Sequence, residues 1–208
     1  MSEVTIRPSA RILLVDAEDR ILLYRGSRMT DAAEHSWFTP GGGIDDGEPL
    51  NHAAARELRE ETGYSVPPEE LGHVVAAAEG HWRHPDGRLF FSRESFFFLR
   101  GRELEVDVSG MEDHERSLID DFRWWSLAEL RSTGEQVIPF GLADLLERLL
   151  TGDIPGESVT LPWHHPDLLV QGSPATGDGV TREGEGQGAS EDGAPAGPAG
   201  SARLGRGS

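Results

Sequence analysis

One short stretch, residues 39–66, constrains this chain more than any other part of its sequence. It reads TPGGGIDDGEPLNHAAARELREETGYSV and contains five glycines and six carboxylates. Pro49 suits the first turn of a helix, where the missing N–H is not needed. Gly63 suits the left-handed residue at which a helix ends. The stretch therefore predicts a glycine-rich loop followed by a helix over Pro49–Thr62.

Three glutamates of this predicted helix, Glu57, Glu60 and Glu61, fall on one side of it, within about one third of the circumference. Acidic clusters of this kind are most often solvated helix faces. However, like charges three and four residues apart destabilise a helix, and a divalent cation shared among them would remove the repulsion. Carboxylate oxygens are the ligands that Mg²⁺ and Mn²⁺ prefer, so the alternative interpretation is a metal site.

The residues around the cluster extend the pattern from Gly42 to Tyr64. Gly42 is followed after five residues by Glu48, and after seven more by the run RELREETGY. This resembles the Nudix box, Gly-x5-Glu-x7-Arg-Glu-U-x-Glu-Glu-x-Gly-U, where U is bulky and apolar. All fixed positions match, and Tyr64 is aromatic where an aliphatic residue is usual, which concerns packing. The resemblance is strongest in the box and extends over roughly 11–151.

The resemblance implies roles for the matching residues. Glu57, Glu60 and Glu61 are implied as ligands of Mg²⁺ or Mn²⁺, and Glu60 and Glu61 also as catalytic residues. The residues implied to hold the loop and helix together and to orient these ligands are Gly42, Glu48, Arg56 and Gly63. The number of metal ions and the substrate-binding residues stay unassigned.

Members of this family often use one more carboxylate from outside the box, as an extra ligand or general base. The segment GMEDHERSLIDDFRWW offers Glu112, Asp113 and Glu115, and Glu94 lies on a predicted strand rich in phenylalanine. We favour Glu115 as a catalytic residue, because its place before RWWSLAEL is similar to that of a late glutamate in many relatives. For each of the four alone, an ordinary surface acid is an equal alternative.

The chain outside the box alternates predicted strands and helices. The predicted strands are Arg11–Asp16, Arg20–Tyr24, His73–Trp82, Arg88–Gly101 and a segment beginning at Phe122, and the predicted helices are SLAELRS and FGLADLLERLLTG. The resemblance implies an α/β fold, an α/β/α sandwich around a mixed β-sheet. Residues 172–208 hold 11 of the 26 glycines and no aromatic residue. We therefore expect a Nudix hydrolase domain over 1–171 and a disordered low-complexity tail over 172–208.

Charge and composition exclude several classes of function. The net charge of −18 argues against a nucleic-acid scaffold. The absence of cysteine excludes thiolate metal sites and a cysteine-dependent isomerase of isopentenyl diphosphate. No apolar run reaches membrane-spanning length, and the first residues lack the pattern of a secretion signal, so we expect a cytoplasmic protein. The oligomeric state stays open, with a homodimer as one option.

The resemblance implies a pyrophosphohydrolase that uses Mg²⁺ or Mn²⁺. Its small-molecule substrate would be a nucleoside diphosphate linked to another group, X, and water would attack phosphorus. The alternative is a non-catalytic nucleotide-sensing module with the same fold. Sensors of that kind usually lack glutamates of the box or carry an added DNA-binding domain, whereas this chain keeps every fixed position. The nucleoside and the group X stay open.

Overall fold

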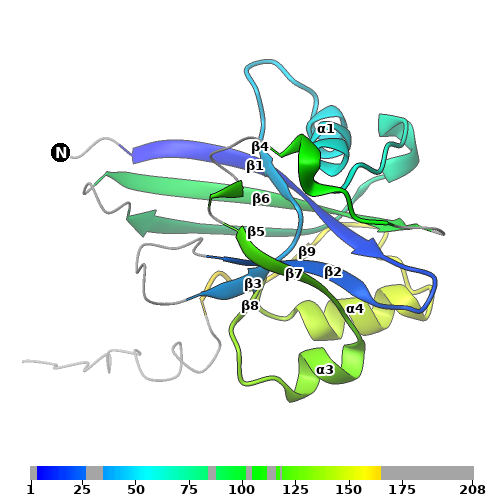
Figure 1. Ribbon diagram of the computed structural model, residues 1–208. Helices are drawn as coiled ribbons and strands as arrows, with labels where there is room; N and C mark the ends of the chain where they lie inside the picture. Colours follow the sequence, from blue (N-terminus) through cyan, green and yellow to red (C-terminus); the bar gives the residue numbers. More distant parts are fainter. Residues whose placement is uncertain are drawn as a thin grey trace, which may run out of the picture. The chain divides into compact units, whose positions relative to one another are not determined.

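The computed structural model describes residues 4–26, 35–83, 88–101, 105–111, 116–117 and 119–164, which are coloured in Figure 1. The predicted tail and the three carboxylates Glu112, Asp113 and Glu115 lie outside these residues. The domain boundary at residue 171 therefore stays a prediction.

A mixed sheet forms the frame of the described part. Its main path runs in the order β8-β3-β2-β1-β6-β5-β9, with β4 paired to β1 and β7 paired to β2. The strands are β1 Val4–Val15, β2 Ile21–Gly26, β3 Ser36–Phe38, β4 Gly41–Gly43, β5 Val74–Arg83, β6 Leu89–Arg100, β7 Ile119–Trp125, β8 Val137–Ile138 and β9 Val159–Thr160. The β1–β6, β3–β8 and β5–β9 pairs are parallel and the others antiparallel.

Helices cover both faces of the sheet (Figure 1). Helix α1 (Leu50–Thr62) packs on one face, beside the 3₁₀ turns η1 (Pro68–Leu71) and η2 (Val108–Gly110), and α3 (Leu127–Ser132) and α4 (Leu142–Leu150) pack on the other. Alternate residues of β1 serve the two faces, because successive side chains of a strand point to opposite sides. Ile12 packs in the α1 core and Leu13 in the α4 core. The predicted α/β/α sandwich is confirmed.

The predicted strands and helices are present, but some of their ends differ from the predicted ones. The first two strands form the predicted hairpin, in which Asp16 N–H donates to the carbonyl of Arg20 at 2.9 Å. Strand β1 begins at Val4, seven residues before its predicted start, because β6 pairs with it in parallel over its whole length. No helix among the described residues combines the length and the apolar character needed to cross a bilayer.

The glycine run was expected to be a loop, and this was wrong. Gly41–Gly43 forms the short strand β4, antiparallel to β1, with Gly41 opposite Arg11 and Gly43 opposite Ser9. The expected strand that precedes it, containing Trp37 and Phe38, is present as β3. The glycine run is therefore fixed to the sheet by backbone pairing before the chain enters α1.

Candidate active site

Helix α1 carries the acidic cluster, and its ends follow the predicted signals. Pro49 precedes the first turn, and Gly63 ends the helix in the left-handed region at φ 72°, with its N–H donating to the Arg59 carbonyl. Leu58 and two alanines bury the apolar side of α1 against the sheet. This orientation also brings Glu57 and Glu61 toward the sheet.

Two glutamates of the cluster are buried. Glu57 is 3% exposed and Glu61 is 4% exposed, whereas the side chain of Glu60 is 28% exposed. Charged side chains are rarely this buried unless they are paired or bind a cation. The interpretation of the cluster as a solvated helix face is therefore wrong for Glu57 and Glu61.

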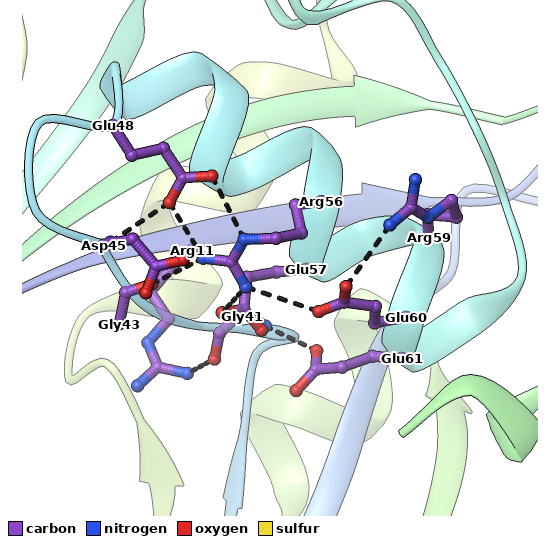
Figure 2. A network of polar contacts seen from close by, with 10 residues as sticks. All are labelled: Arg11, Gly41, Gly43, Asp45, Glu48, Arg56, Glu57, Arg59, Glu60 and Glu61. Carbon is purple, nitrogen blue, oxygen red and sulfur yellow. Dashed lines mark hydrogen bonds and ion pairs between the residues drawn. The ribbon is translucent and has the colours of Figure 1, made fainter. Parts of the chain in front are cut away.

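The guanidinium of Arg56 is the centre of the polar network in Figure 2. Nη1 of Arg56 donates to Oε1 of Glu57 at 2.8 Å and to Oε2 of Glu60 at 3.3 Å. Its Nε and Nη2 donate to the two oxygens of Glu48 at 3.1 and 2.9 Å, and Nη2 also donates to the Gly43 carbonyl at 3.0 Å. One arginine thus joins the end of the glycine strand to two of the three clustered glutamates.

This network controls the charges of its members. The hydrogen bonds from Arg56 hold the pKa of Glu48 below its usual value, and those to Glu48 and Glu57 raise the pKa of Arg56. Both groups are therefore charged at neutral pH. A bidentate arginine–carboxylate pair also fixes orientation, because its two parallel bonds define a plane. The geometry agrees with the orienting roles that the resemblance implies for Arg56 and Glu48, which stay predictions.

Glu61 is held by the glycine strand and by the sheet. The N–H of Gly41 donates to Oε2 of Glu61 at 2.6 Å, and the hydroxyl of Tyr24 on β2 donates to the Glu61 carbonyl at 2.7 Å. Burial raises the pKa of Tyr24, so its hydroxyl keeps its proton. Side chain and backbone of Glu61 are therefore both fixed by donors from outside α1.

Two glycines of β4 have no room for a side chain. Gly41 has φ +117°, and a Cβ placed there would lie 2.2 Å from the Ala10 carbonyl oxygen. A Cβ on Gly42 would lie 2.6 Å from Oε1 of Glu57 and 2.8 Å from its Oε2. The carboxylate of Glu57 thus occupies the space that any larger residue at position 42 would need.

The residues of the cluster fit a divalent cation by their chemistry. All three are carboxylates, the hard donors that Mg²⁺ and Mn²⁺ prefer. Nη1 of Arg56 lies within hydrogen-bonding distance of both Glu57 and Glu60, so two of them already share one cationic centre. No three acidic or histidine side chains in the described ranges, however, stand together closely enough to hold an ion as they are. Glu57, Glu60 and Glu61 are therefore suitable ligands, but they do not form a complete coordination site in this structure.

Of the candidates outside the box, the structure describes only Glu94. It lies on β6, is 3% exposed, and forms an ion pair with Arg11 of β1 at 3.4 Å. The suggestion of an ordinary surface acid is therefore wrong for Glu94. Glu112, Asp113 and Glu115 lie outside the described residues, so the preference for Glu115 stays a prediction.

The sequence interpretation missed Arg11. It is 7% exposed, and its Nη1 donates to the carbonyl of Gly41. A signal was present, because one charged residue in the apolar run ARILLV must either face solvent or find a buried partner.

Most aromatic side chains that could stack on a base belong to the core. Trp37, Phe38 and Trp125 are buried in the sheet. Trp82 is half-buried and stacks on Phe90 with 4.7 Å between ring centroids. None of these contacts identifies a base-binding residue.

Comparisons with known proteins agree with this geometry. A family model described as NUDIX domain matches residues 5–148. An RNA pyrophosphohydrolase of Novosphingobium aromaticivorans is 31% identical over 144 residues, covering 64% of this chain and 84% of the relative. One of Caulobacter vibrioides is 32% identical over 151 residues, covering 64% and 78%. The solved NUDIX domain of Shewanella oneidensis NrtR, complexed with ADP ribose, has a TM-score of 0.50 and 17% identity over 72% of this chain and 90% of that one. At that identity the likeness concerns the fold alone.

Proposed function

This chain belongs to the Nudix family of hydrolases, and on that premise we propose that it cleaves the diphosphate linkage of a nucleoside diphosphate joined to a further group, X. The observation that carries the proposal is the burial of Glu57 and Glu61 against the glycine strand, with Arg56 joining Glu57 to Glu60. Glu57, Glu60 and Glu61 would hold Mg²⁺ or Mn²⁺.

The proposed reaction is attack of water on a phosphorus of the diphosphate. A bond forms between the water oxygen and phosphorus, the P–O bond of the anhydride breaks, and its electron pair leaves with the departing phosphate. The water gives up its protons to a base and to solvent. The bound cation would neutralise charge on the phosphates and lower the pKa of bound water.

The chain's own residues prepare this chemistry. Arg56 keeps Glu57 and Glu60 turned toward one point, and Gly41 N–H fixes the carboxylate of Glu61. Gly42 leaves the space that the Glu57 carboxylate fills. These contacts limit the orientations open to the three carboxylates in the protein alone, and a bound cation would still have to draw the carboxylates together.

The group X is open, and two classes of substrate have support. A small nucleotide follows from the family's chemistry. RNA carrying a 5′ phosphoanhydride is a second candidate, favoured because relatives at 31% and 32% identity are named RNA pyrophosphohydrolases. The net charge of −18 disfavours extended contact with an RNA backbone. For RNA we therefore propose that only the 5′ end would be bound.

A substrate panel tests the proposal. Purified protein with Mg²⁺ or Mn²⁺ is assayed against nucleotide sugars, ADP-ribose, NADH, dinucleoside polyphosphates, oxidised dNTPs and 5′-triphosphorylated RNA, with excess EDTA as the metal-free control. We expect turnover of at least one substrate that EDTA abolishes. Binding of a nucleotide without any turnover would instead support the sensing module.

A matched pair of variants locates the activity. Glu60→Gln should abolish most turnover, whereas Glu147→Gln, an exposed glutamate of α4 that pairs with Arg131, should leave it unchanged. Equal activity of both variants in saturating Mg²⁺ would show that the cluster on α1 is not the catalytic site.

A further inference from the structure

A buried ion pair lies in the sheet beside the glycine strand. Arg11 on β1 and Glu94 on β6 are 7% and 3% exposed, and Nε of Arg11 lies 3.4 Å from Oε1 of Glu94. The two strands are parallel neighbours, with Ser9 opposite Glu94. Removing two charges from water is costly, and a buried pair often stabilises no more than apolar residues of similar size. Stability alone therefore explains this pair poorly.

The same arginine contacts the glycine strand. Nη1 of Arg11 donates to the carbonyl of Gly41, and the N–H of Gly41 donates to Oε2 of Glu61 at 2.6 Å. The backbone of Gly41 is thus held by two charged side chains, Arg11 at its carbonyl and Glu61 at its N–H. The contacts run from Glu94 through Arg11 and Gly41 to Glu61, and Figure 2 shows the last three of these residues side by side.

The chemistry of this chain of contacts requires an arginine. A guanidinium carries its charge and its N–H groups in one rigid plane, so it can form an ion pair with Glu94 on one side while Nη1 donates to the Gly41 carbonyl. A lysine has a single ammonium at the end of a flexible stem and would pair with Glu94 or reach the Gly41 carbonyl without fixing their mutual direction. An ion pair needed only for charge balance in the sheet would tolerate lysine.

We propose that Arg11 is a positioning residue: anchored by Glu94, it fixes Gly41, which in turn holds the carboxylate of Glu61 in the orientation used for hydrolysis. This inference rests on the proposed function for the role of Glu61. It assigns Glu94 to anchoring Arg11 in place of the general-base role considered from the sequence.

Kinetics of single variants test the catalytic part. Arg11→Lys should lower kcat by about 10- to 100-fold with little change in KM, since misplacement of a catalytic group by about 1 Å has an effect of that size. Glu94→Gln should show a similar loss and an unchanged pH profile of kcat. The control is Arg131→Gln, which removes an exposed arginine that pairs with Asp144 and Glu147, and it should behave as the parent. A pH profile of kcat that loses its acidic limb in Glu94→Gln would show a general base and overturn the anchoring role.

A double variant separates positioning from folding. Arg11→Met with Glu94→Gln removes both charges, so no unpaired buried charge is left to unfold the protein. If Arg11 positions Gly41, this variant should fold and melt near the parent temperature. Its kcat should be as low as that of Arg11→Lys, because the effects of residues in one chain of contacts do not add. A folded double variant with the kcat of the parent would show that the Arg11–Glu94 pair contributes only to the structure of the sheet and does not position Glu61.

A readout without substrate or metal keeps this test apart from the proposed function. In the metal-free protein, the Gly41 amide should exchange its hydrogen slowly and resonate downfield, because it donates a short hydrogen bond to a carboxylate. Arg11→Lys should speed its exchange at least tenfold while the Ile12 amide, which donates to the Pro40 carbonyl, stays protected. If Arg11→Lys leaves the exchange rate of the Gly41 amide unchanged, the positioning role is overturned even if the enzyme is active. If the exchange rate rises but the parent protein turns over no substrate, only the proposed function is wrong.

Discussion

Substituting the three glycines of β4 one at a time gives a graded test of the site. The decisive change is Gly42→Ala, because its added methyl carbon would lie 2.6 Å from Oε1 of Glu57 and 2.8 Å from the carboxyl carbon. Gly42 does not have a left-handed φ, so its backbone accepts alanine. The added volume therefore acts on the Glu57 side chain and little on the fold.

The size of the effect follows from these contacts. The shortest is about 0.8 Å below the 3.4 Å at which ordinary van der Waals contact begins. The Glu57 carboxylate must retreat by about that distance, which would disturb the 2.8 Å hydrogen bond that its Oε1 accepts from Nη1 of Arg56. A displacement of about 1 Å at a catalytic group costs on the order of 100-fold in rate, or about 2.7 kcal/mol of activation free energy. We expect this loss in kcat, with a change in unfolding free energy within about 1 kcal/mol.

The neighbouring glycines are the controls. Gly43→Ala should be silent, since a Cβ there meets nothing within 4 Å. Gly41→Ala should fail to fold or melt far below the parent, because its Cβ would meet the backbone of β1 and its φ is +117°. Steady-state kinetics on the best panel substrate and thermal melts of all three proteins are the assay. Parental kcat in Gly42→Ala, or an equal loss in Gly43→Ala, would refute the assignment of Glu57 to the site.

The remaining predictions concern single groups and the tail. Glu60→Gln should stay folded by circular dichroism and lose about three decades of turnover, because an amide is a poor ligand for Mg²⁺ and cannot accept a proton. Tyr24→Phe should lower the urea-derived unfolding free energy by about 1 to 2 kcal/mol, because the buried carbonyl of Glu61 loses its donor. The pKa of Glu48 is lowered in the folded protein, so its stabilisation is present above the unfolded pKa of about 4.3 and is lost as pH falls through the folded pKa. The parent should therefore lose more stability than Glu48→Gln between pH 6 and pH 3 in urea titrations. Ending the chain at Gln171 should leave the melting temperature and turnover nearly unchanged, because so few apolar residues are removed.

The sequence alone determined the local parts of this protein. Proline and glycine signals at both ends placed α1 to within one residue, because these residues act through their own backbone angles. The spacing of Glu57, Glu60 and Glu61 placed them on one side of the helix, because residues three and four positions apart share a helix face. Arg56 and Glu48 were identified through the resemblance to the Nudix box. The order of strands and helices and the two-sided sandwich also followed from runs of apolar residues and from the resemblance.

Only the tertiary structure decided which distant groups meet. The glycine run lacks side chains, so nothing local in it predicts a strand, and β4 forms by antiparallel pairing with residues 9–11 of β1. Glu57 and Glu61 looked as exposed as Glu60 in the sequence, and their burial depends on how α1 sits on the sheet. Arg11 and Glu94 are separated by 83 positions, and the parallel register of β1 and β6 brings them together. Strand register is set by packing over the whole sheet, so a pairing of this kind is fixed only when the sheet is assembled.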